Sequence, residues 1–332
     1  MIMEKVVILG AGVGGLGAGV WLKSHGIDFT IIEGKQELPL NLHNGVHYLH
    51  DLPELPFTLD FDRIPLFDGV MGKDGVVRDY VTLQDCLEYS FKVLGVQQPS
   101  SVLEVGKIDK VIMPKGEGLN ELIKQMYEYI GADHFMFGAW TDSFLNGSVT
   151  IKQGANTFSI KYSWIVSTVP LDVLLKIARI YTECEFKSNP IHVYNFNVND
   201  IKKNWLINIY FPDPDTPIYR ASVMNGVCST ESTKFLTDIE IYLSIQKLKM
   251  FNLEDKHEYY NWNTGKVLSI EPSDRKRLIE ELYKQNIFTL GRFGLWNRRL
   301  LVNSTINQAH NIADVIANKD DWERVKLTLS NL

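Results

Sequence analysis

The order of apolar and polar residues predicts a mixed α/β fold with two kinds of strand. Val6–Leu9 is a short, wholly apolar run, which is typical of a strand buried on both faces of a parallel sheet. A glycine-rich segment follows it and predicts a helix over about residues 14–24, and residues 27–32 predict a second buried strand. The later segments HVYNFNV, LINIYF and IYRASVMN alternate between apolar and polar residues, which indicates an antiparallel sheet.

The remaining patterns assign these strands to two discontinuous domains. Residues 118–130 predict an amphipathic helix, residues 148–162 a hairpin, and residues 278–285 and 304–317 two further helices. We expect an N-terminal Rossmann-like domain made of residues 1–55, 102–172 and 284–332. A smaller α+β substrate domain, built on the antiparallel sheet, would take residues 56–101 and 173–283.

The glycines between the first strand and the first helix have the spacing of a phosphate-binding loop. Gly10, Gly12 and Gly15 form the pattern GxGxxG. In this motif the first glycine permits a tight turn, the second lets a pyrophosphate approach the backbone, and the third lets the helix pack close to the strand. The first helical amides, beginning at Val13 and Gly14, direct the positive end of the helix dipole towards the phosphates.

An acidic residue at the end of the second strand completes the dinucleotide pattern. Glu33 stands where a carboxylate can accept hydrogen bonds from ribose hydroxyls. The alternative, a chance run of glycines, is disfavoured because the strand, the helix and the acid that the motif requires are all present. The motif alone does not separate NAD from FAD, but its place at the N-terminus and the further glycines Gly19 and Gly26 resemble FAD-binding proteins of the two-dinucleotide-binding fold.

Composition and charge exclude several classes of protein. Of 332 residues, 45% are hydrophobic and 22% charged, which predicts a folded chain with a sizeable core. The net charge of −6 and the lack of a basic stripe argue against strong duplex nucleic-acid binding, although one or two arginines could hold a nucleotide. Cys86, Cys184 and Cys228 are too far apart for a disulfide framework or a metal pair. The lack of a signal peptide and of a long apolar window predicts a cytoplasmic protein with no membrane span, and the oligomeric state stays open.

Five short blocks, in the same order along the chain, resemble the superfamily of flavin amine oxidases and UDP-galactopyranose mutases. NGVHYLHD at 44–51 resembles the GPHIFH segment of the mutases, and YSFKVLG at 89–95 and IVSTVPLDVLL at 165–175 resemble two further blocks. FPDPDTPIYRASVMN at 211–225 is similar to a FPEDNCPFYRAT stretch, and TLGRFGLWN at 289–297 to a GRFGSW segment. The resemblance implies that the cofactor is FAD and that the substrate is a small or nucleotide-linked molecule.

The motif and the resemblance together assign the cofactor site. The residues expected to contact FAD are Gly10, Gly12, Val13, Gly14, Gly15, Glu33, Gly45, His47, Thr168, Pro170, Gly291, Arg292, Asn303 and Ser304. His47 would lie near the flavin ring, where a neutral or cationic imidazole could stabilise charge on the reduced flavin; a satisfied core histidine is the alternative. His43, His47 and His50 fall on an expected turn and strand, which would turn them to different faces, so no metal site is expected.

The resemblance also implies a substrate site. Its expected residues are Tyr89, Lys92, Tyr219, Arg220 and Trp296, with His47 and Arg220 as the catalytic pair. Arg220 matches the mutase arginine that holds the substrate diphosphate, and a surface ion pair is the alternative explanation. Tyr89 and Lys92 are equally well explained as one solvated face of a helix.

Three functions stay open from the sequence. The favoured one is an FAD-dependent oxidoreductase that oxidises a C–N bond in a small acidic or phosphorylated substrate. The second is a mutase-like isomerisation of a nucleotide sugar by the reduced flavin, and the third is a non-enzymatic flavin protein. The oxidoreductase is favoured because Leu94 replaces a tryptophan of the mutase pattern, and because no tyrosine-rich substrate segment is recognisable in residues 237–250.

Overall fold

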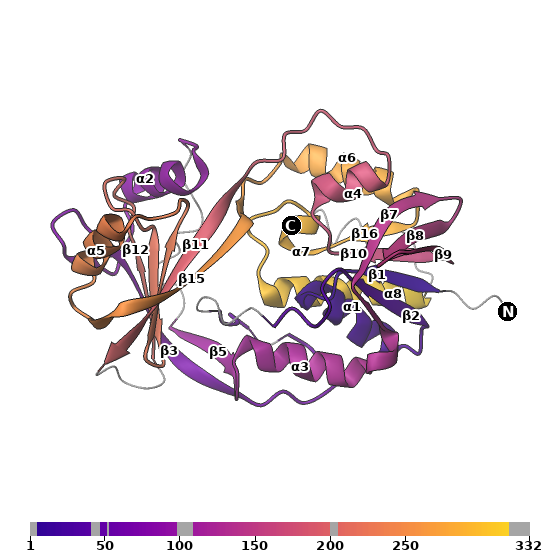
Figure 1. Ribbon diagram of the computed structural model, residues 1–332, viewed down its shortest axis with the longest axis horizontal. Coiled ribbons are helices and arrows are strands. Elements are labelled where there is room, and N and C mark those ends of the chain that lie inside the picture. Colours follow the sequence, from indigo (N-terminus) through magenta and orange to yellow (C-terminus); the bar gives the residue numbers. More distant parts are fainter. Residues whose placement is uncertain (1–4, 41–46, 52, 98–108, 200–204, 319–332) are drawn as a thin grey trace.

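The computed structural model describes residues 5–40, 47–51, 53–97, 109–199 and 205–318. Figure 1 shows an elongated molecule with a parallel sheet and its helices at one end and a large curled sheet at the other. The long strands β11 (Ser188–Asn199) and β15 (Asn252–Val267) run side by side from one end towards the other. The predicted α/β class is confirmed.

The parallel sheet has five strands gathered from distant parts of the chain. Their order is β16 (Ile287–Thr289), β10 (Trp164–Ser167), β1 (Val6–Leu9), β2 (Phe29–Glu33) and β6 (Phe135–Phe137). All four pairings are parallel. The central strand β1 is buried on both faces, as its wholly apolar sequence predicts.

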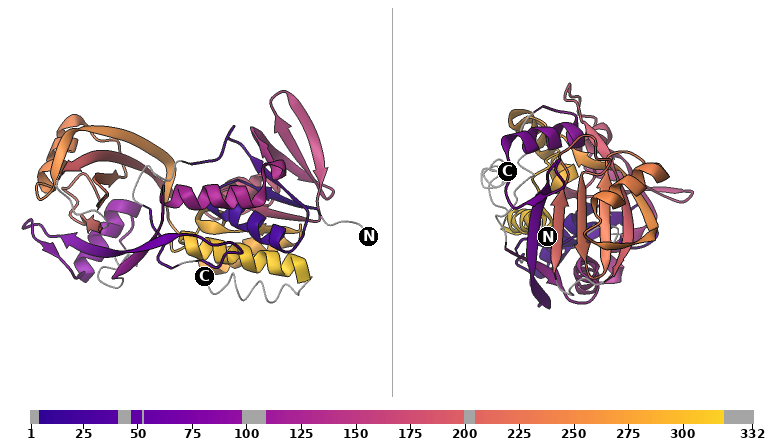
Figure 2. Two further views of the ribbon diagram at one scale, coloured as in Figure 1. Left: turned by 90° about the horizontal axis from the view of Figure 1, so that it is seen from below. Right: turned by 90° about the vertical axis from the view of Figure 1, so that its left-hand side faces the viewer.

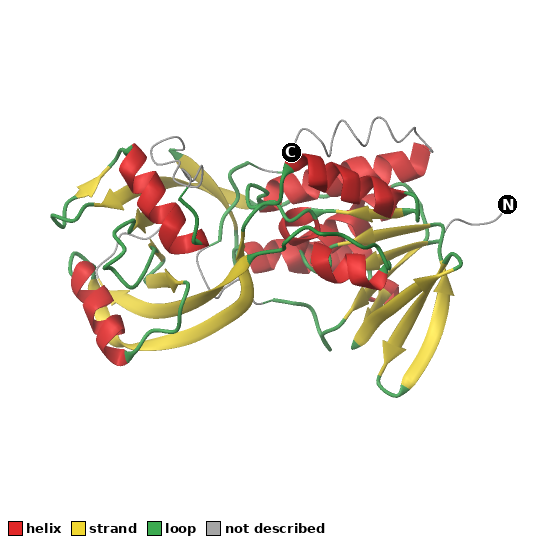
Figure 3. Ribbon diagram, turned by 90° about the horizontal axis from the view of Figure 1, so that it is seen from above, coloured by secondary structure: helices red, strands yellow, loops and turns green. Residues whose placement is uncertain are grey.

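Helices and a small sheet cover the two faces of the parallel sheet (Figure 3). Val6 and Ile8 face a core shared with α1 (Val13–Ser24), α3 (Leu119–Ile130) and α8 (Val302–Asn318). Val7 and Leu9 face the opposite core. The elements that contribute to this second core include α4 (Leu171–Ile177), α6 (Pro272–Tyr283), β7 (Ala139–Leu145), β8 (Ser148–Gln153) and β9 (Asn156–Lys161).

The first and last described helices lie against each other. α1 and α8 are in contact, with Gly17 facing α8. A Cβ at Gly17 would stand 3.3 Å from the Cβ of Ala309 and 3.5 Å from the Cα of Ile306. The small residue therefore sets how closely the two helices can approach.

The second sheet is largely antiparallel and curls on itself (Figure 2). Its main path is β15, β11, β14 (Val227–Ser232), β13 (Arg220–Met224), β12 (Leu206–Tyr210), β3 (Phe61–Met71) and β4 (Val77–Arg78), and β5 (Lys110–Pro114) pairs with β3. The exception to the antiparallel pattern on this path is the parallel pairing of β12 with β3. The antiparallel sheet predicted from alternation is confirmed. The helices α2 (Leu83–Leu94) and α5 (Asp238–Lys247) belong to this end of the molecule.

The two faces of this sheet differ in chemistry. One face packs an apolar core in which Phe196, Phe211 and Val223 meet Ile241 of α5. On the other face, the register aligns Tyr210, Arg220 and Glu231 across three strands. Cross-strand partners share a face, so these residues form one row. A second row on the same face lies two residues away from the first along the strands. It contains Asp68, Asn208, Ser222, Ser229 and Asn195. We call this surface the polar face.

The domain boundaries given above stay a prediction, but two helices do not pack as that division implies. The predicted boundary at residues 172 and 173 divides α4 and places all of α6 in the substrate domain. Leu174 of α4 and Leu278 of α6 instead pack in the core that contains Val7. Their apolar faces place both helices on the parallel sheet. α6 also begins earlier than expected, at Pro272 in the first helical turn, where proline is well tolerated.

Within the described ranges, no helix combines the length and the apolar character needed to cross a membrane.

Candidate functional site

The glycine loop packs tightly on itself and against the chain at the ends of the two neighbouring strands. Gly10 has a φ of 97° and donates its N–H to the carbonyl of Ile32 at 2.8 Å. A Cβ at Gly10 would lie 2.3 Å from Oγ1 of Thr168, and a Cβ at Gly15 would lie 1.8 Å from the carbonyl oxygen of Gly10. The first and third glycines therefore have the structural roles that the motif predicts.

Gly12 differs from its two neighbours in the motif. It precedes the first turn of α1 with φ −70° and ψ 178°, a conformation open to any residue. No described atom lies within 4 Å of the position that its Cβ would take. Neither the backbone nor the surrounding protein requires a glycine here. The amides of Val13 and Gly14 follow at the start of the helix, where backbone N–H groups favour an anion.

Glu33 connects the end of β2 to the glycine loop. Its Oε2 accepts the N–H of Ala11 at 2.7 Å, and its Oε1 accepts the N–H of Lys35 at 2.9 Å. Each carboxylate oxygen can accept a further hydrogen bond. The carboxylate is therefore fixed beside the glycine loop, and its expected contact with a ribose stays a prediction.

The cofactor residues expected later in the chain border the same end of the parallel sheet. Thr168 donates both its N–H and its hydroxyl to the carbonyl of Leu9, each at 2.9 Å. Pro170 precedes the first turn of α4. Gly291 has a φ of 79° and donates its N–H to Oε1 of Gln308 at 3.1 Å. Asn303, which is followed by Ser304, lies in the first turn of α8, and its Oδ1 is buried with no hydrogen-bond partner among the described residues.

A buried group of charges lies on the polar face. Nη2 of Arg220 donates to Oε1 of Glu231, and the hydroxyl of Tyr219 donates to Oε2 of the same carboxylate. Nζ of Lys266 lies 3.7 Å from that Oε2 and 4.9 Å from the centroid of the Tyr219 ring. Arg292, whose Nε donates to the carbonyl of Leu300 at 3.2 Å, comes from α7 (Gly291–Gly294). We call Arg220, Glu231, Lys266 and Arg292 the charged cluster.

The charged cluster is net positive. Burial alone would raise the pKa of Glu231, but Arg220 and Lys266 outweigh it and lower that pKa to about 2. Burial lowers the pKa of Lys266 to about 8, although Glu231 opposes the shift. Burial and the charge of Arg220 lower the pKa of Arg292 as well, but an arginine stays protonated near neutral pH. One carboxylate therefore faces three cations, which favours an anionic group nearby.

His47 is held neutral beside this cluster. Burial is the largest cause that lowers its pKa, to about 4, and the charges of Arg220, Arg292 and Lys266 act in the same direction. Of the two charge states that the sequence left open, the structure favours the neutral imidazole. Gly45 and His43 lie outside the described residues. Among those described, no three His, Cys, Asp or Glu side chains gather as a metal site would require.

The lowered pKa of His47 predicts a pH-dependent stability. The folded pKa of about 4 is below the unfolded value of 6.5, so the unfolded chain binds more protons between these limits. The contribution of His47 is fully present above pH 6.5 and is lost as the pH falls to 4, with a size of about 2 kcal/mol after allowance for its partial exposure.

Denaturant unfolding at several pH values measures this contribution as a difference between two proteins. The free energy of unfolding of the wild type should fall more steeply from pH 6.5 to 4 than that of His47→Gln. Parallel curves for the two proteins would show that His47 is protonated as easily in the folded state as in the unfolded chain.

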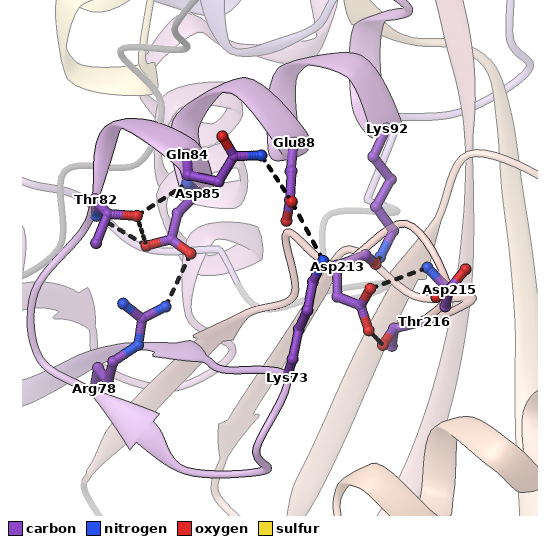
Figure 4. A network of polar contacts seen from close by, with 10 residues as sticks. All are labelled: Lys73, Arg78, Thr82, Gln84, Asp85, Glu88, Lys92, Asp213, Asp215 and Thr216. Atoms are coloured by element: carbon purple, nitrogen blue, oxygen red, sulfur yellow. Dashed lines mark hydrogen bonds and ion pairs between the residues drawn. The ribbon is translucent and has the colours of Figure 1, made fainter.

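Lys92 has a structural role that neither sequence explanation anticipated. Its Nζ donates to the carbonyls of Phe211, Asp213 and Ile218 at 2.8, 2.7 and 2.6 Å. Figure 4 shows the side chain reaching from α2 to the loop that carries Asp213. Burial lowers the pKa of Lys92 to about 7, but three acceptor carbonyls require the protonated ammonium, and we take it to be charged. All three donors are in use, which leaves none for a substrate.

The other expected substrate residues are largely buried. Tyr89 packs edge-on against Tyr210 and Tyr219, with ring centroids 5.8 and 6.0 Å apart, and its hydroxyl has no partner among the described residues. Trp296 is buried in the core beneath the parallel sheet and packs edge-on against Phe186 at 5.2 Å. The hydroxyl of Tyr219 donates its hydrogen bond to Glu231, as described above. The solvated helix face considered for Tyr89 is therefore wrong, because the ring is 1% exposed.

Sequence reasoning missed Glu231 and Lys266. A signal for Glu231 was available, because it is the one charged residue in the strand VCSTES. A carboxylate within an otherwise buried strand requires a partner. Lys266 gave no such signal, since it follows the segment NLEDKHEYYNWNTG, which is already rich in polar and charged residues.

The comparisons with known proteins agree on the fold. No family model matches the sequence, and no curated protein matches it. A structure of reduced UDP-galactopyranose mutase superposes with a TM-score of 0.73 at 17% identity, covering 99% of this chain and 97% of that one. A fatty acid isomerase from P. acnes that produces CLA gives a TM-score of 0.61 at 14% identity, covering 94% of this chain and 98% of that one. A p-nitrophenol 4-monooxygenase from Pseudomonas putida gives 0.57 at 9% identity, covering 98% and 84%.

The similarity therefore extends over almost the whole chain, although identity is low. The fold of this chain is the one found in a UDP-galactopyranose mutase and in enzymes of other activities, as the five sequence blocks predicted.

Proposed function

We propose that this chain is an FAD-dependent enzyme, and the observation that carries the proposal is the open space at Gly12. A glycine that neither the backbone nor a protein contact requires indicates a ligand that must approach the main chain. The start of α1 and the fixed carboxylate of Glu33 fit a pyrophosphate and a ribose. Asn303, with its unpartnered buried oxygen, fits a further polar part of the same cofactor.

The reaction that we favour is oxidation of a C–N bond in a small acidic or phosphorylated substrate. A bound flavin supplies two-electron redox chemistry, and the protein supplies binding and orientation. The net positive charged cluster would orient an anionic substrate group and stabilise negative charge on a reduced cofactor. His47, as a neutral imidazole, can donate or accept one hydrogen bond without adding charge.

The second candidate is the mutase-like isomerisation of a nucleotide sugar. The observation that favours it is the superposition with the mutase over both chains. The engagement of Arg220 with Glu231 weighs against it, because that guanidinium is already partly occupied and is less available for a bidentate grip on a diphosphate.

Replacing Gly12 by alanine tests the cofactor proposal. We expect FAD affinity, measured by fluorescence titration, to fall at least about tenfold, because a methyl group would enter the space that a pyrophosphate needs. The unfolding free energy of the cofactor-free protein should change by less than about 0.5 kcal/mol, since the backbone accepts any residue there.

Gly17→Ala on the same helix is the matched control. It should alter stability through its contact with α8 and leave FAD affinity nearly unchanged. Equal FAD affinity in Gly12→Ala and the wild type would contradict the placement of the phosphates.

The two reactions are separated by the state of flavin that each requires. Anaerobic bleaching of the oxidised protein by an amine would support the oxidoreductase. Conversion of UDP-galactofuranose by the dithionite-reduced protein, with no bleaching by amines, would establish the mutase reaction instead.

A further inference from the structure

Four polar atoms on the polar face are buried without partners among the described residues. They are Oδ1 of Asp68, Oδ1 of Asn208, Oγ of Ser222 and Nε of Arg220. Asp68, Asn208 and Ser222 are direct cross-strand neighbours on β3, β12 and β13, and Arg220 lies two residues from Ser222 on the same face. Orphaned buried polar atoms are rare in folded proteins, and the three oxygens in direct register indicate a donor group that pairs with them. Nε of Arg220 is itself a donor and requires an acceptor instead.

Burial and hydrogen bonding fix the side chains of Asp68, Asn208 and Ser222 in positions that a ligand can use. Asn208 is fully buried, and its Nδ2 donates to the hydroxyl of Tyr48 at 3.0 Å, which directs Oδ1 elsewhere as an acceptor. Ser222 is 1% exposed. Asp68 is partly exposed, so a ligand can reach it from outside the sheet.

Keeping the carboxylate of Asp68 ionised costs free energy in the folded protein. Burial raises its pKa to about 6, although the amide of Asn208 and the charge of Arg220 oppose the shift. Arg220 already pairs with Glu231, and the other titratable groups that act on Asp68 are the neutral hydroxyls of Tyr48 and Tyr210. No described cation forms an ion pair with Asp68, so its carboxylate has only the partial compensation that the charge of Arg220 provides.

We propose that Asp68 and Asn208, with Ser222 beside them, form a binding site for a primary ammonium group of the substrate. An ammonium has three N–H donors and a positive charge, whereas the row offers acceptor oxygens and an unpaired negative charge. A neutral hydroxyl has one donor and would leave the charge of Asp68 uncompensated. The inference rests on the proposed function in one respect, which is that the bound ammonium is taken to belong to the substrate. Binding of an ammonium can itself be measured without any redox reaction.

Calorimetric titration of the FAD-loaded protein at pH 8 with n-butylammonium chloride, and separately with butan-1-ol, tests the site. We expect the amine to bind at least tenfold more tightly than the alcohol of matched shape. Asp68→Asn should weaken the amine at least tenfold and leave the alcohol unchanged. Binding of the amine by the wild type should also weaken as the pH falls through 6, because protonation removes the charge of Asp68.

Asp62→Asn is the matched control, since Asp62 is exposed on the same strand and forms an ion pair with Lys115 at 3.9 Å. It should bind the amine like the wild type. A second measurement excludes a purely structural role: at pH 8 and without amine, Asp68→Asn should unfold at a higher temperature than the wild type, because it removes a buried charge.

Equal affinity for amine and alcohol, unchanged amine binding in Asp68→Asn, or a lower unfolding temperature of that variant would each overturn the proposal. A protein that binds the amine through Asp68 but is never bleached by amines would instead contradict the C–N oxidation and leave the ammonium site standing.

Discussion

Arg220→Ala is expected to destabilise the protein by about 3 kcal/mol, the lower end of the range for breaking a buried ion pair. The substitution leaves the carboxylate of Glu231 buried, with the hydroxyl of Tyr219 and with Lys266 at 3.7 Å as its remaining partners. Those two partners keep the loss from reaching the upper end of the range. Denaturant unfolding of the cofactor-free protein at pH 7 measures the effect.

The double variant Arg220→Met/Glu231→Leu provides the comparison. Removing both charges leaves no unpaired carboxylate, and the buried Lys266, whose pKa burial already lowers, can lose its proton once Glu231 is gone. The double variant should therefore recover part of the stability that Arg220→Ala loses. A loss below about 1 kcal/mol in Arg220→Ala would show that Glu231 is well solvated and that the ion pair behaves like a surface pair.

Gly15→Ala is expected to be the most damaging single methyl addition in the glycine loop, with a loss of at least about 3 kcal/mol. The new Cβ would fall 1.8 Å from the carbonyl oxygen of Gly10, a backbone atom that cannot rotate away. Helix α1 would have to move off β1, and the loop would open. The unfolding free energy of the cofactor-free variant is the measurement, with Gly12→Ala as the control three residues away. A Gly15→Ala protein as stable as the wild type would mean that β1 and α1 are farther apart than described.

The sequence predicted the fold of the first strand, the glycine loop and the first helix well because its signals there are local. The strand, the three glycines and Glu33 lie within one short stretch, and each position has a steric or hydrogen-bonding reason that does not depend on the rest of the chain. The parallel sheet could be foreseen from Val6–Leu9 for the same reason, since an unbroken apolar run requires cover on both faces.

The polar face could not be predicted because it depends on register. Arg220 was identified from a motif, but its partner Glu231 is fixed by the pairing of β13 with β14, and Asp68 comes close to Asn208 only through the parallel pairing of β3 with β12. A one-residue shift in any of these pairings would turn the side chains to the opposite face. The role of Lys92 escaped prediction in a similar way, because its three acceptors belong to a loop about 120 residues away.

The contact between α1 and α8 has a consequence for the order in which the protein is made. The ribosome produces α1 roughly 280 residues before α8 appears. At about 5–20 residues per second, α1 waits on the order of half a minute for that partner. Its sequence VGGLGAGVWLKS contains four glycines, which are weak helix formers, so α1 gains little stability on its own. The glycine loop is therefore expected to become rigid only late in synthesis, and a ribosome that stalls before residue 302 would carry a chain whose glycine loop lacks the support of α8.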